Sequence, residues 1–388
     1  MNILIIARGV PTDKTPQDGV FEFEQAKALK KAGHSVVIMA VETRIKLQWR
    51  KIGITEYTKE GIDTFRIFLF PTSIIRRISF KLSNWIEQKL AQKCYRHVLQ
   101  KYGDFDIVHA HFLPCASHGV AIKDKYNINL VATEHWSELN KNPISPYVKY
   151  LGKNTYKKVD RLISVCKPLK NRIFELFQAD SQVIHNMVDK MFEDDYTPTR
   201  SNIKDGFCFL MVGSIIYRKG IDVLIKAFAK SGLANKGVTV KVIGTYFPYI
   251  ETLKKLIRNN NLSDSVIIAP AQPKRKIYEE LKRADAFVLP SRNENFSVAV
   301  LEALAAGLPV ISTQTGGILE CLDKSNGIVV PVEDVDALAD AMIYMYENID
   351  SYDKIMIRKN CMDRFSSKAI TRQMENTYCS ILDSVKNI

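Results

Sequence analysis

The chain has 388 residues, about two or three domain lengths, and its 46% hydrophobic and 25% charged residues are typical of a globular protein. No apolar run approaches the ~20 residues that a membrane-spanning helix needs, and the apolar start is too short, and lacks the basic leader, to be a signal peptide. Seven scattered cysteines without a Cys-x-x-Cys pair argue against structural zinc or disulfides and favour a reducing compartment.

The formal net charge of +13 is concentrated in the first half of the chain. Residues 1–185 contain 29 Lys+Arg and 17 Asp+Glu, a net of +12, whereas residues 186–388 contain 26 and 25, a net of +1. The excess either serves solubility or lets the first half meet an anionic membrane surface or a phosphate-bearing acceptor. Solubility alone would be served by an even spread, so the second interpretation is favoured.

Strand-like and helix-like segments alternate through the first half. A helix is predicted over residues 20–32, and the predicted strands are 2–7, 35–40, 106–110, 130–133 and 161–165. This alternation indicates parallel strands joined by crossover helices, which form a doubly wound α/β sheet.

Candidate ligand-binding residues follow several of these strands. The loop at residues 8–19 lacks Gly-x-Gly-x-x-Gly, so the usual dinucleotide fingerprint is missing. Gly19 precedes the first helix, where its small size either permits close approach to the backbone or only makes the turn. His109 and His111 end one strand and His135 follows the next. Open α/β sheets bind ligands at this edge, and we expect His135 to be the functional histidine.

Basic and aromatic residues are concentrated at residues 44–51, which include Trp49, and again at 74–101. In the second stretch, apolar residues recur at helical spacing, at Ile78, Leu82, Trp85, Ile86 and Leu90. The pattern is that of a basic amphipathic helix. Two interpretations stay open: the helix rests on an anionic bilayer, or it packs its apolar stripe on the core.

A second cycle of strands and helices begins near residue 207. A helix is predicted over 221–231, and the predicted strands are 207–212, 238–243, 265–268, 286–289 and 310–312. Two cycles of near domain length predict two Rossmann-like halves facing each other, joined by the polar segment 189–205. We place the domains at residues 1–188 and 189–364.

The segment 291–310 is the most informative part of the sequence. Glu294 lies in the turn that enters a helix predicted over 297–306, and Glu302 lies eight residues later, inside that helix. The first amides of a helix have no intrahelical partner and carry partial positive charge, so they would hold a phosphate. Carboxylates accept hydrogen bonds from hydroxyls. The arrangement suits a sugar nucleotide, with diphosphate on the amides, ribose on one acid and hexose on the other.

This segment resembles the donor site of glycosyltransferase family 4. As in that family, Glu-x7-Glu runs into Glu-Ala-Leu-Ala-Ala-Gly-Leu-Pro-Val and then Gly316-Gly317, although Asn295 and Ser297 stand where the family usually has glycine. The family consists of retaining enzymes with the GT-B architecture, in which two Rossmann-like domains face each other across a cleft.

The resemblance implies that Glu294 contacts the transferred sugar and Glu302 the nucleotide ribose. It also implies that the amides of Phe296, Ser297 and Val298 bind the diphosphate. These residues make the C-terminal domain the donor-binding domain and leave the acceptor to the N-terminal domain.

The resemblance extends to the loop after the first strand of the second half, where Gly213, Lys219 and Gly220 match the family pattern. Ser214 replaces the family's Arg, and Arg218 could supply a guanidinium instead. Lys219 then stabilises the charge that grows on the β-phosphate as the sugar departs, a kind of stabilisation that is often the largest in catalysis.

In the first half the resemblance implies that Gly19 lies beside the donor phosphate and His135 near the C6 hydroxyl of the transferred sugar. Asn186-Met187-Val188-Asp189 is similar to the family's Asn-Gly-Val-Asp and is expected to shape the interdomain hinge without chemistry. The final segment, about residues 365–388, is expected to be a helix that packs back on the first domain.

The predicted protein is therefore a cytoplasmic retaining hexosyltransferase of cell-surface polysaccharide synthesis. It would use a UDP- or GDP-sugar donor and a glycan or lipid-linked acceptor, with peripheral contact to the inner face of the membrane and no nucleic acid partner. The Asp-x-Asp motif of metal-dependent transferases occurs twice, at Asp104-Phe105-Asp106 and at Asp334-Val335-Asp336. Both copies lie far from the donor motif, so no metal is expected. The alternatives are a sugar-nucleotide epimerase of the same architecture and a non-catalytic sugar-nucleotide-binding protein.

Overall fold

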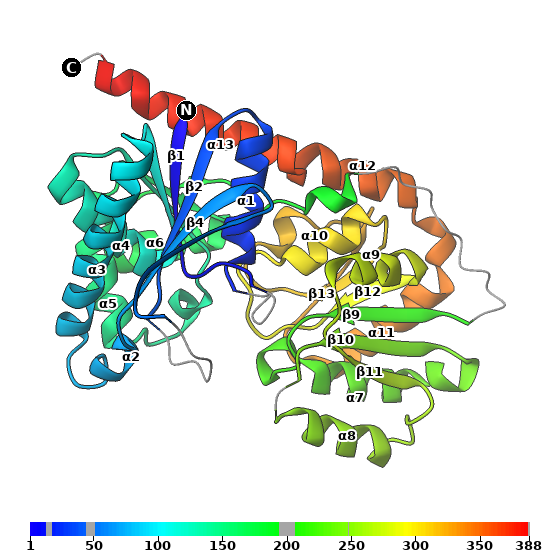
Figure 1. Cartoon of the computed structure of the whole chain (residues 1–388). Helices are drawn as coiled ribbons and strands as arrows, with labels where there is room; N and C mark the ends of the chain where they lie inside the picture. Colours follow the sequence, from blue (N-terminus) through cyan, green and yellow to red (C-terminus); the bar gives the residue numbers. More distant parts are fainter. Residues whose placement is uncertain (13–17, 44–50, 194–205, 247, 387–388) are drawn as a thin grey trace. The chain divides into compact units, whose positions relative to one another are not determined.

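The computed structural model describes residues 1–12, 18–43, 51–193, 206–246 and 248–386 (Figure 1). The chain forms two compact units: unit 1 is Met1–Ile184 with Ile370–Ile388, and unit 2 is His185–Ala369. The division falls four residues before the predicted boundary at 188/189, and unit 1 resumes at residue 370. The basic residues 44–50, with Trp49, and most of the predicted linker 189–205 lie outside the described residues.

The described residues of unit 1 contain an eight-stranded sheet in the order β3-β4-β2-β1-β5-β6-β7-β8. All neighbouring strands are parallel except β3, which pairs antiparallel with β4. The central strand β1 has Ile3, Leu4, Ile5 and Ile6 fully buried, because helices cover both faces of a parallel sheet. The strands are β1 Asn2–Ala7, β2 Ser35–Val41, β3 Gly53–Lys59, β4 Ile62–Phe68, β5 Ile107–His111, β6 Leu130–Glu134, β7 Arg161–Ser164 and β8 Gln182–Val183.

Helices connect these strands as crossover elements. They are α1 Val20–Lys31, α2 Thr72–Ile75, α3 Phe80–Tyr102, α4 Phe112–Tyr126, α5 Pro146–Thr155 and α6 Lys167–Phe177. The β3–β4 hairpin was not predicted. Its two-residue turn is Glu60-Gly61, with φ of 46° and 75°, and this left-handed turn is usually marked by Asn-Gly or Asp-Gly rather than Glu-Gly.

Unit 2 has a six-stranded sheet in its described residues, parallel throughout, in the order β11-β10-β9-β12-β13-β14. Numbered within the unit, this is 3-2-1-4-5-6, the order of a Rossmann fold. The strands are β9 Cys208–Val212, β10 Thr239–Gly244, β11 Val266–Pro270, β12 Ala286–Leu289, β13 Val310–Thr313 and β14 Gly327–Val330, and the helices are α7 Ile221–Ser231, α8 Ile250–Asn259, α9 Lys274–Arg283, α10 Val298–Ala305, α11 Val335–Glu347 and α12 Lys354–Phe365. The doubly wound sheets predicted for both halves are confirmed.

The last helix, α13 at Ser367–Lys386, belongs to unit 1 from Ile370 onward (Figure 1). Tyr378 is fully buried there, and its hydroxyl lies 2.6 Å from Nδ1 of His109. The seven cysteines, all among the described residues, form no disulfides there, and five of them are buried. Within the described residues, no helix has the length and apolar character that crossing a bilayer requires.

Candidate active site

The strand order of unit 2 reverses at β9, which pairs with β10 on one side and with β12 on the other. Open α/β sheets bind ligands at such a switch point, beyond the carboxyl ends of the strands. Gly213 and Lys219 follow β9, and Glu294 follows β12. A Cβ atom at Gly213 would lie 3.4 Å from Cε of Lys219, so the lysine side chain passes directly over this glycine. The topology thus brings these three predicted site residues to one edge of the sheet.

Glu294 is surrounded by hydrogen-bond donors. Its Oε1 lies 2.6 Å from Nζ of Lys219 and 3.3 Å from Nη1 of Arg218, and it accepts a 3.0 Å hydrogen bond from the Ser291 hydroxyl. Arg218 also donates to the carbonyl of Asn293 at 2.7 Å, which fixes its guanidinium beside the carboxylate. The side chains of Lys219 and Glu294 are only 11% and 14% exposed, so their attraction is weakly screened by solvent.

These donors decide the protonation state of Glu294. Burial raises the pKa of this carboxyl, but the charges of Lys219 and Arg218 and the hydrogen bonds from Lys219 and Ser291 outweigh burial. The net effect holds the pKa of Glu294 below its ordinary value. Glu294 is therefore an anion at neutral pH, suited to accept hydrogen bonds from hydroxyls and unsuited to donate a proton.

Two glycines let neighbouring loops touch the backbone of the Glu294 loop. Gly220 has a φ of 69°, and a Cβ atom there would lie 1.9 Å from the carbonyl oxygen of Pro290. Gly316 has a φ of 50°, and its Cβ atom would lie 2.2 Å from the carbonyl oxygen of Asn295 and 2.4 Å from that of Glu294. Only glycine fits both the left-handed backbone and the close approach at these positions.

Helix α10 begins directly after the Glu294 loop. Ser297 stands at its N-cap, but the serine side chain makes no capping hydrogen bond. The first helical amides, which have no intrahelical partner and carry partial positive charge, are thus not satisfied by a side-chain cap. Phe296 is buried, whereas Ser297, Val298 and Glu302 are half-buried, with Glu302 in the second turn of the helix.

A brace that the sequence did not reveal holds the entrance of this helix. Nδ2 of Asn186 donates a 2.7 Å hydrogen bond to the carbonyl oxygen of Phe296. The Phe296 ring packs on the rings of His185 and Phe365, at 4.6 and 5.6 Å between centroids, and Nε2 of His185 lies 3.0 Å from Oε2 of Glu320. The segment expected only to shape a hinge therefore positions the loop before α10.

In unit 1 the three predicted histidines form a stack that begins at His109, in the middle of β5, and ends at His135, beyond the carboxyl end of β6. Ring centroids are 4.5 Å apart for His109 and His111 and 5.3 Å apart for His111 and His135, and Nδ1 of His111 lies 3.1 Å from Nε2 of His135. His109 also contacts the hydroxyls of Tyr378 and Thr133. Burial lowers the pKa of His109 to about 3 and holds that of His111 well below its ordinary value, so both are neutral at pH 7.

In unit 1, Gly19 stands two residues before Phe21, whose ring lies against His135. Gly19 has a φ of 66°, and a Cβ atom there would lie 2.0 Å from the carbonyl oxygen of Gly9, so the turn itself requires glycine. Phe21, in the first turn of α1, stacks on His135 at 6.2 Å between centroids. Phe112 has a φ of 69°, a strained conformation that often marks functional sites, and its ring lies 4.9 Å from that of His135.

The two Asp-x-Asp segments have local structural roles. Asp334 caps α11 by accepting a 2.9 Å hydrogen bond from the amide of Ala337. Oδ2 of Asp106 accepts a 2.7 Å hydrogen bond from the amide of Asn2. Among the described residues, no group of three or more His, Cys, Asp or Glu side chains is placed to hold a metal ion.

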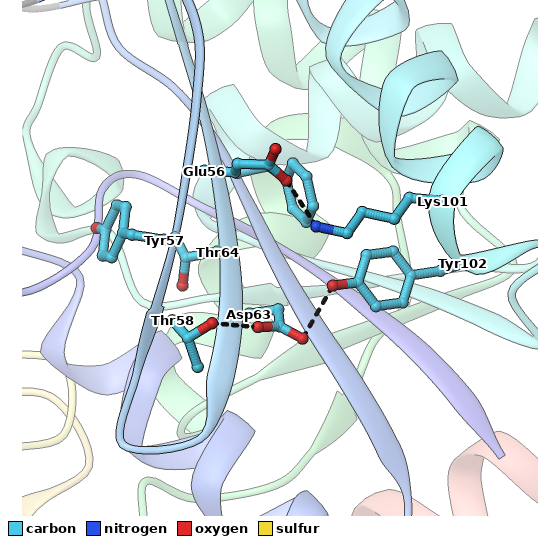
Figure 2. A pocket seen from close by; sticks show the side chains of 8 residues that line it. Glu56, Tyr57, Thr58, Asp63, Thr64, Lys101 and Tyr102 are labelled. Carbon is cyan, nitrogen blue, oxygen red and sulfur yellow. Dashed lines mark hydrogen bonds and ion pairs between the residues drawn. The ribbon is translucent and has the colours of Figure 1, made fainter.

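Figure 2 shows a pocket of about 90 Å³ beside the β3–β4 hairpin of unit 1. Its polar groups satisfy one another: Glu56 pairs with Lys101 at 2.7 Å, and Asp63 accepts hydrogen bonds of 2.5 and 2.9 Å from Thr58 and Tyr102. These contacts tie the hairpin to the end of α3, and we interpret the pocket as structural.

Known proteins resemble this chain over nearly its full length. The profile of the family described as Glycosyltransferase Family 4 matches residues 20–191, and that of Glycosyl transferases group 1 matches residues 194–360. The chain is 24% identical over 384 residues to N-acetyl-alpha-D-glucosaminyl L-malate synthase of Bacillus anthracis, with 95% of each chain covered. It is 26% identical over 376 residues to TuaC of Bacillus subtilis strain 168, a glycosyltransferase assigned provisionally to teichuronic acid biosynthesis, with 90% of each covered.

Solved structures share the fold. Sucrose-phosphate synthase from Thermosynechococcus elongatus matches with a TM-score of 0.79 at 19% identity, over 99% of both chains. Anabaena Alr3699/HepE, solved in complex with UDP and glucose, matches with a TM-score of 0.74 at 17% identity, over 98% of this chain and 100% of the other.

The two Rossmann-like units and the likeness to these solved structures confirm the predicted GT-B fold class. Together with the family matches, they define a glycosyltransferase of the GT-B type. Within that class, the chain belongs to glycosyltransferase family 4.

Proposed function

We propose that this enzyme transfers a hexose-type sugar from a nucleotide-diphosphate donor to an acceptor hydroxyl, with retention of the anomeric configuration. The observation that carries the proposal is the Lys219–Glu294 pair in the loops that precede α7 and α10. A cation, an anion and a helix start without a side-chain cap, gathered at a switch point, are the groups that a sugar diphosphate needs.

Each group has a separate role in this proposal. Glu294 accepts hydrogen bonds from hydroxyls of the transferred sugar, and Glu302 accepts them from the ribose. The diphosphate rests on the first amides of the α10 entrance, at Phe296, Ser297 and Val298.

Lys219 supports departure of the nucleotide. On donor binding its ammonium exchanges part of its contact with Glu294 for the β-phosphate, and it then stabilises the charge that develops there. Arg218 adds a second cation, and Gly213 leaves room for the phosphate. From unit 1 we assign two further donor contacts on the strength of the family resemblance, Gly19 with phosphate and His135 with a sugar hydroxyl.

Retention then follows from attack on the face that the nucleotide leaves. Glu294 is already engaged by Lys219, Arg218 and Ser291, and no other described carboxylate stands out as a covalent nucleophile. The departing phosphate would accept the proton of the acceptor hydroxyl. The acceptor oxygen would then bond to the anomeric carbon on the face from which the phosphate leaves. No divalent metal is required for this sequence of events.

The donor is proposed to be a UDP- or GDP-sugar. The structural relative from Anabaena was solved with UDP and glucose, which favours UDP over GDP in this proposal. The acceptor is proposed to be a glycan or lipid-linked glycan of cell-surface polysaccharide synthesis, as the relative assigned to teichuronic acid biosynthesis suggests. We place the enzyme in the cytoplasm, in contact with the inner face of the cell membrane.

The test begins with a thermal-shift screen against nucleoside diphosphates, because a selective ligand raises apparent stability by mass action. Transfer from the selected donor is then measured for Glu294→Ala, Glu302→Ala and Lys219→Ala. Glu279→Ala, at a half-exposed helix position in unit 2, is the control. We expect loss of transfer in the three site variants, and full activity in all three would refute the site.

The two rival functions are separated by the same assay. An epimerase would convert the donor sugar with no acceptor present. A binding protein would show saturable donor binding without turnover over a panel of acceptors.

A further inference from the structure

Helix α3 exposes apolar side chains and buries polar ones along its first turns. In the segment from α2 into α3, Ile74 is 51% exposed, Ile78 88%, Leu82 48% and Trp85 56%. The stripe predicted from the sequence therefore divides: Leu90 is buried, whereas its N-terminal members face solvent. Core packing accounts only for the later part of this helix.

Polar side chains occupy the inner face of the same turns. Ser83, Asn84 and Glu87 are buried, with Glu87 only 1% exposed. Glu87 accepts hydrogen bonds from Thr72 at 2.7 Å, Ser83 at 2.9 Å and Arg76 at 2.8 Å, which fixes the angle at which α2 meets α3. A helix whose only role was to pack on the core would bury its apolar side chains and expose its polar ones.

The charge of this face is of one sign. Glu87 is the only acid among residues 69–103, and its carboxylate is buried. The exposed cations alternate with the exposed apolar groups at helical spacing, and they are Arg77, Lys81, Lys89, Lys93 and Arg96. Their charges are thus not neutralised by any acid of their own segment.

From this arrangement we propose that the α2–α3 face, defined as Ile74, Arg77, Ile78, Lys81, Leu82, Trp85 and Lys89, docks on an anionic lipid bilayer. The apolar side chains enter the acyl boundary, Trp85 sits at the headgroup level, and the cations meet lipid phosphates. A protein partner would have to complement both the exposed apolar side chains and the surrounding cations of this face. An anionic bilayer supplies an apolar layer and a layer of phosphates without a specific fit.

The docking surface deepens the proposed function, because a lipid-linked acceptor would be met at the same surface, but it stands on unit 1 alone. Binding to vesicles needs neither donor nor acceptor. Vesicle binding and transfer to a water-soluble acceptor can therefore fail independently of each other.

The experiment is sedimentation of the full-length protein with two kinds of vesicle, one of phosphatidylcholine alone and one of phosphatidylcholine with about 30% phosphatidylglycerol. The salt concentration is ~0.1 M, where the Debye length is about 10 Å. We expect binding only to the anionic vesicles, weakened by added salt. Ile78→Ser with Trp85→Ser should abolish binding. Lys81→Gln with Lys89→Gln should reduce the partition coefficient roughly 25-fold, since each basic residue near the surface contributes about fivefold.

Matched controls lie in unit 2. Ile355→Ser removes an apolar side chain that is 62% exposed on α12, and Lys255→Gln with Lys276→Gln removes two exposed lysines of other helices. Circular dichroism should show all variants folded, and the control variants should bind like the unaltered protein.

Three outcomes would overturn the docking surface. Equal sedimentation with neutral and anionic vesicles would do so, as would undiminished binding by the Ile78/Trp85 variant. The third is a protein dimer in size-exclusion chromatography that Ile78→Ser dissociates, because that face would then belong to a second copy of the chain.

Discussion

Lys219 Nζ and Glu294 Oε1 lie 2.6 Å apart, although 75 positions separate the two residues in the chain. Each residue follows a different one of two paired strands, β9 and β12, so the contact forms only when the centre of the unit 2 sheet is assembled. In the proposed function, a phosphate that binds Lys219 would weaken this contact and let Glu294 accept a hydrogen bond from a sugar hydroxyl while Arg218 and Ser291 still hold its carboxylate.

The first prediction concerns this pair. Lys219→Met removes the ammonium but keeps the aliphatic stem, so the pKa of Glu294 should rise toward its ordinary value while Arg218 and Ser291 still hold the carboxylate. We expect the transfer rate to fall about 10²–10³-fold, as for loss of one preorganised donor to a developing charge. Steady-state transfer assays measure the rate, with Lys230→Met, whose partner Asp336 is exposed, as the control. An unchanged rate would remove Lys219 from the mechanism.

The second prediction concerns the brace at the entrance of α10. Asn186→Ala removes the 2.7 Å hydrogen bond to the carbonyl of Phe296, so the amides that we propose bind the diphosphate should lose their fixed position. Donor affinity should fall about tenfold, while the free energy of unfolding falls by about 1 kcal/mol. Calorimetric titration and urea unfolding measure the two effects. Asn260→Ala, which removes a 2.8 Å hydrogen bond to the carbonyl of Leu256, should lose similar stability without weakening the donor.

The third prediction separates backbone conformation from steric fit. Gly232 and Gly316 both have left-handed φ values, of 67° and 50°, but a Cβ atom at Gly232 meets nothing within 4 Å, whereas one at Gly316 collides with two backbone carbonyls. Gly232→Ala should therefore reduce the free energy of unfolding by about 1–2 kcal/mol, the cost of the left-handed backbone. Gly316→Ala should reduce it further and abolish donor binding. Equal losses in the two variants would show that the Glu294 loop tolerates displacement.

The fourth prediction is a pH dependence of stability. The pKa of His109 is about 3 in the folded protein, against about 6.5 in an unfolded chain, so the unfolded state binds more protons below pH 6.5. The stability that His109 contributes is therefore complete above that pH and is lost as the pH falls toward 3, by up to about 1.4 kcal/mol per pH unit. Urea unfolding of His109→Gln between pH 7 and pH 4 should show a shallower decline than the unaltered protein. Parallel declines would contradict the assignment.

Much of the fold follows from local sequence. Strand β1 and strand β12 coincide with the predicted ranges, because each is a short apolar run with clear ends. The sequence also marks the Glu294 loop as a helix entrance, since Pro290 stands directly after β12 and Gly307 just beyond the end of α10. Periodicity and turn residues carry this information in the sequence itself.

Other features depend on contacts that no local pattern encodes. The Asn186 brace joins residues 110 positions apart, and nothing near Asn186 marks its acceptor. The amphipathic stripe of α3 predicted two faces but not which face is buried. The buried face is set by hydrogen bonds to Glu87 from Thr72 in α2 and from Arg76, the residue directly after α2.

Unit 1 is assembled from two stretches of chain, whereas unit 2 is continuous. During synthesis the ribosome completes unit 2 before it releases α13, so the earlier stretch must wait for its final helix. Until α13 packs against the sheet of unit 1, His109 lacks its contact with the Tyr378 hydroxyl. A fragment ending at residue 369 should therefore retain a cooperative second half and a loosened first half.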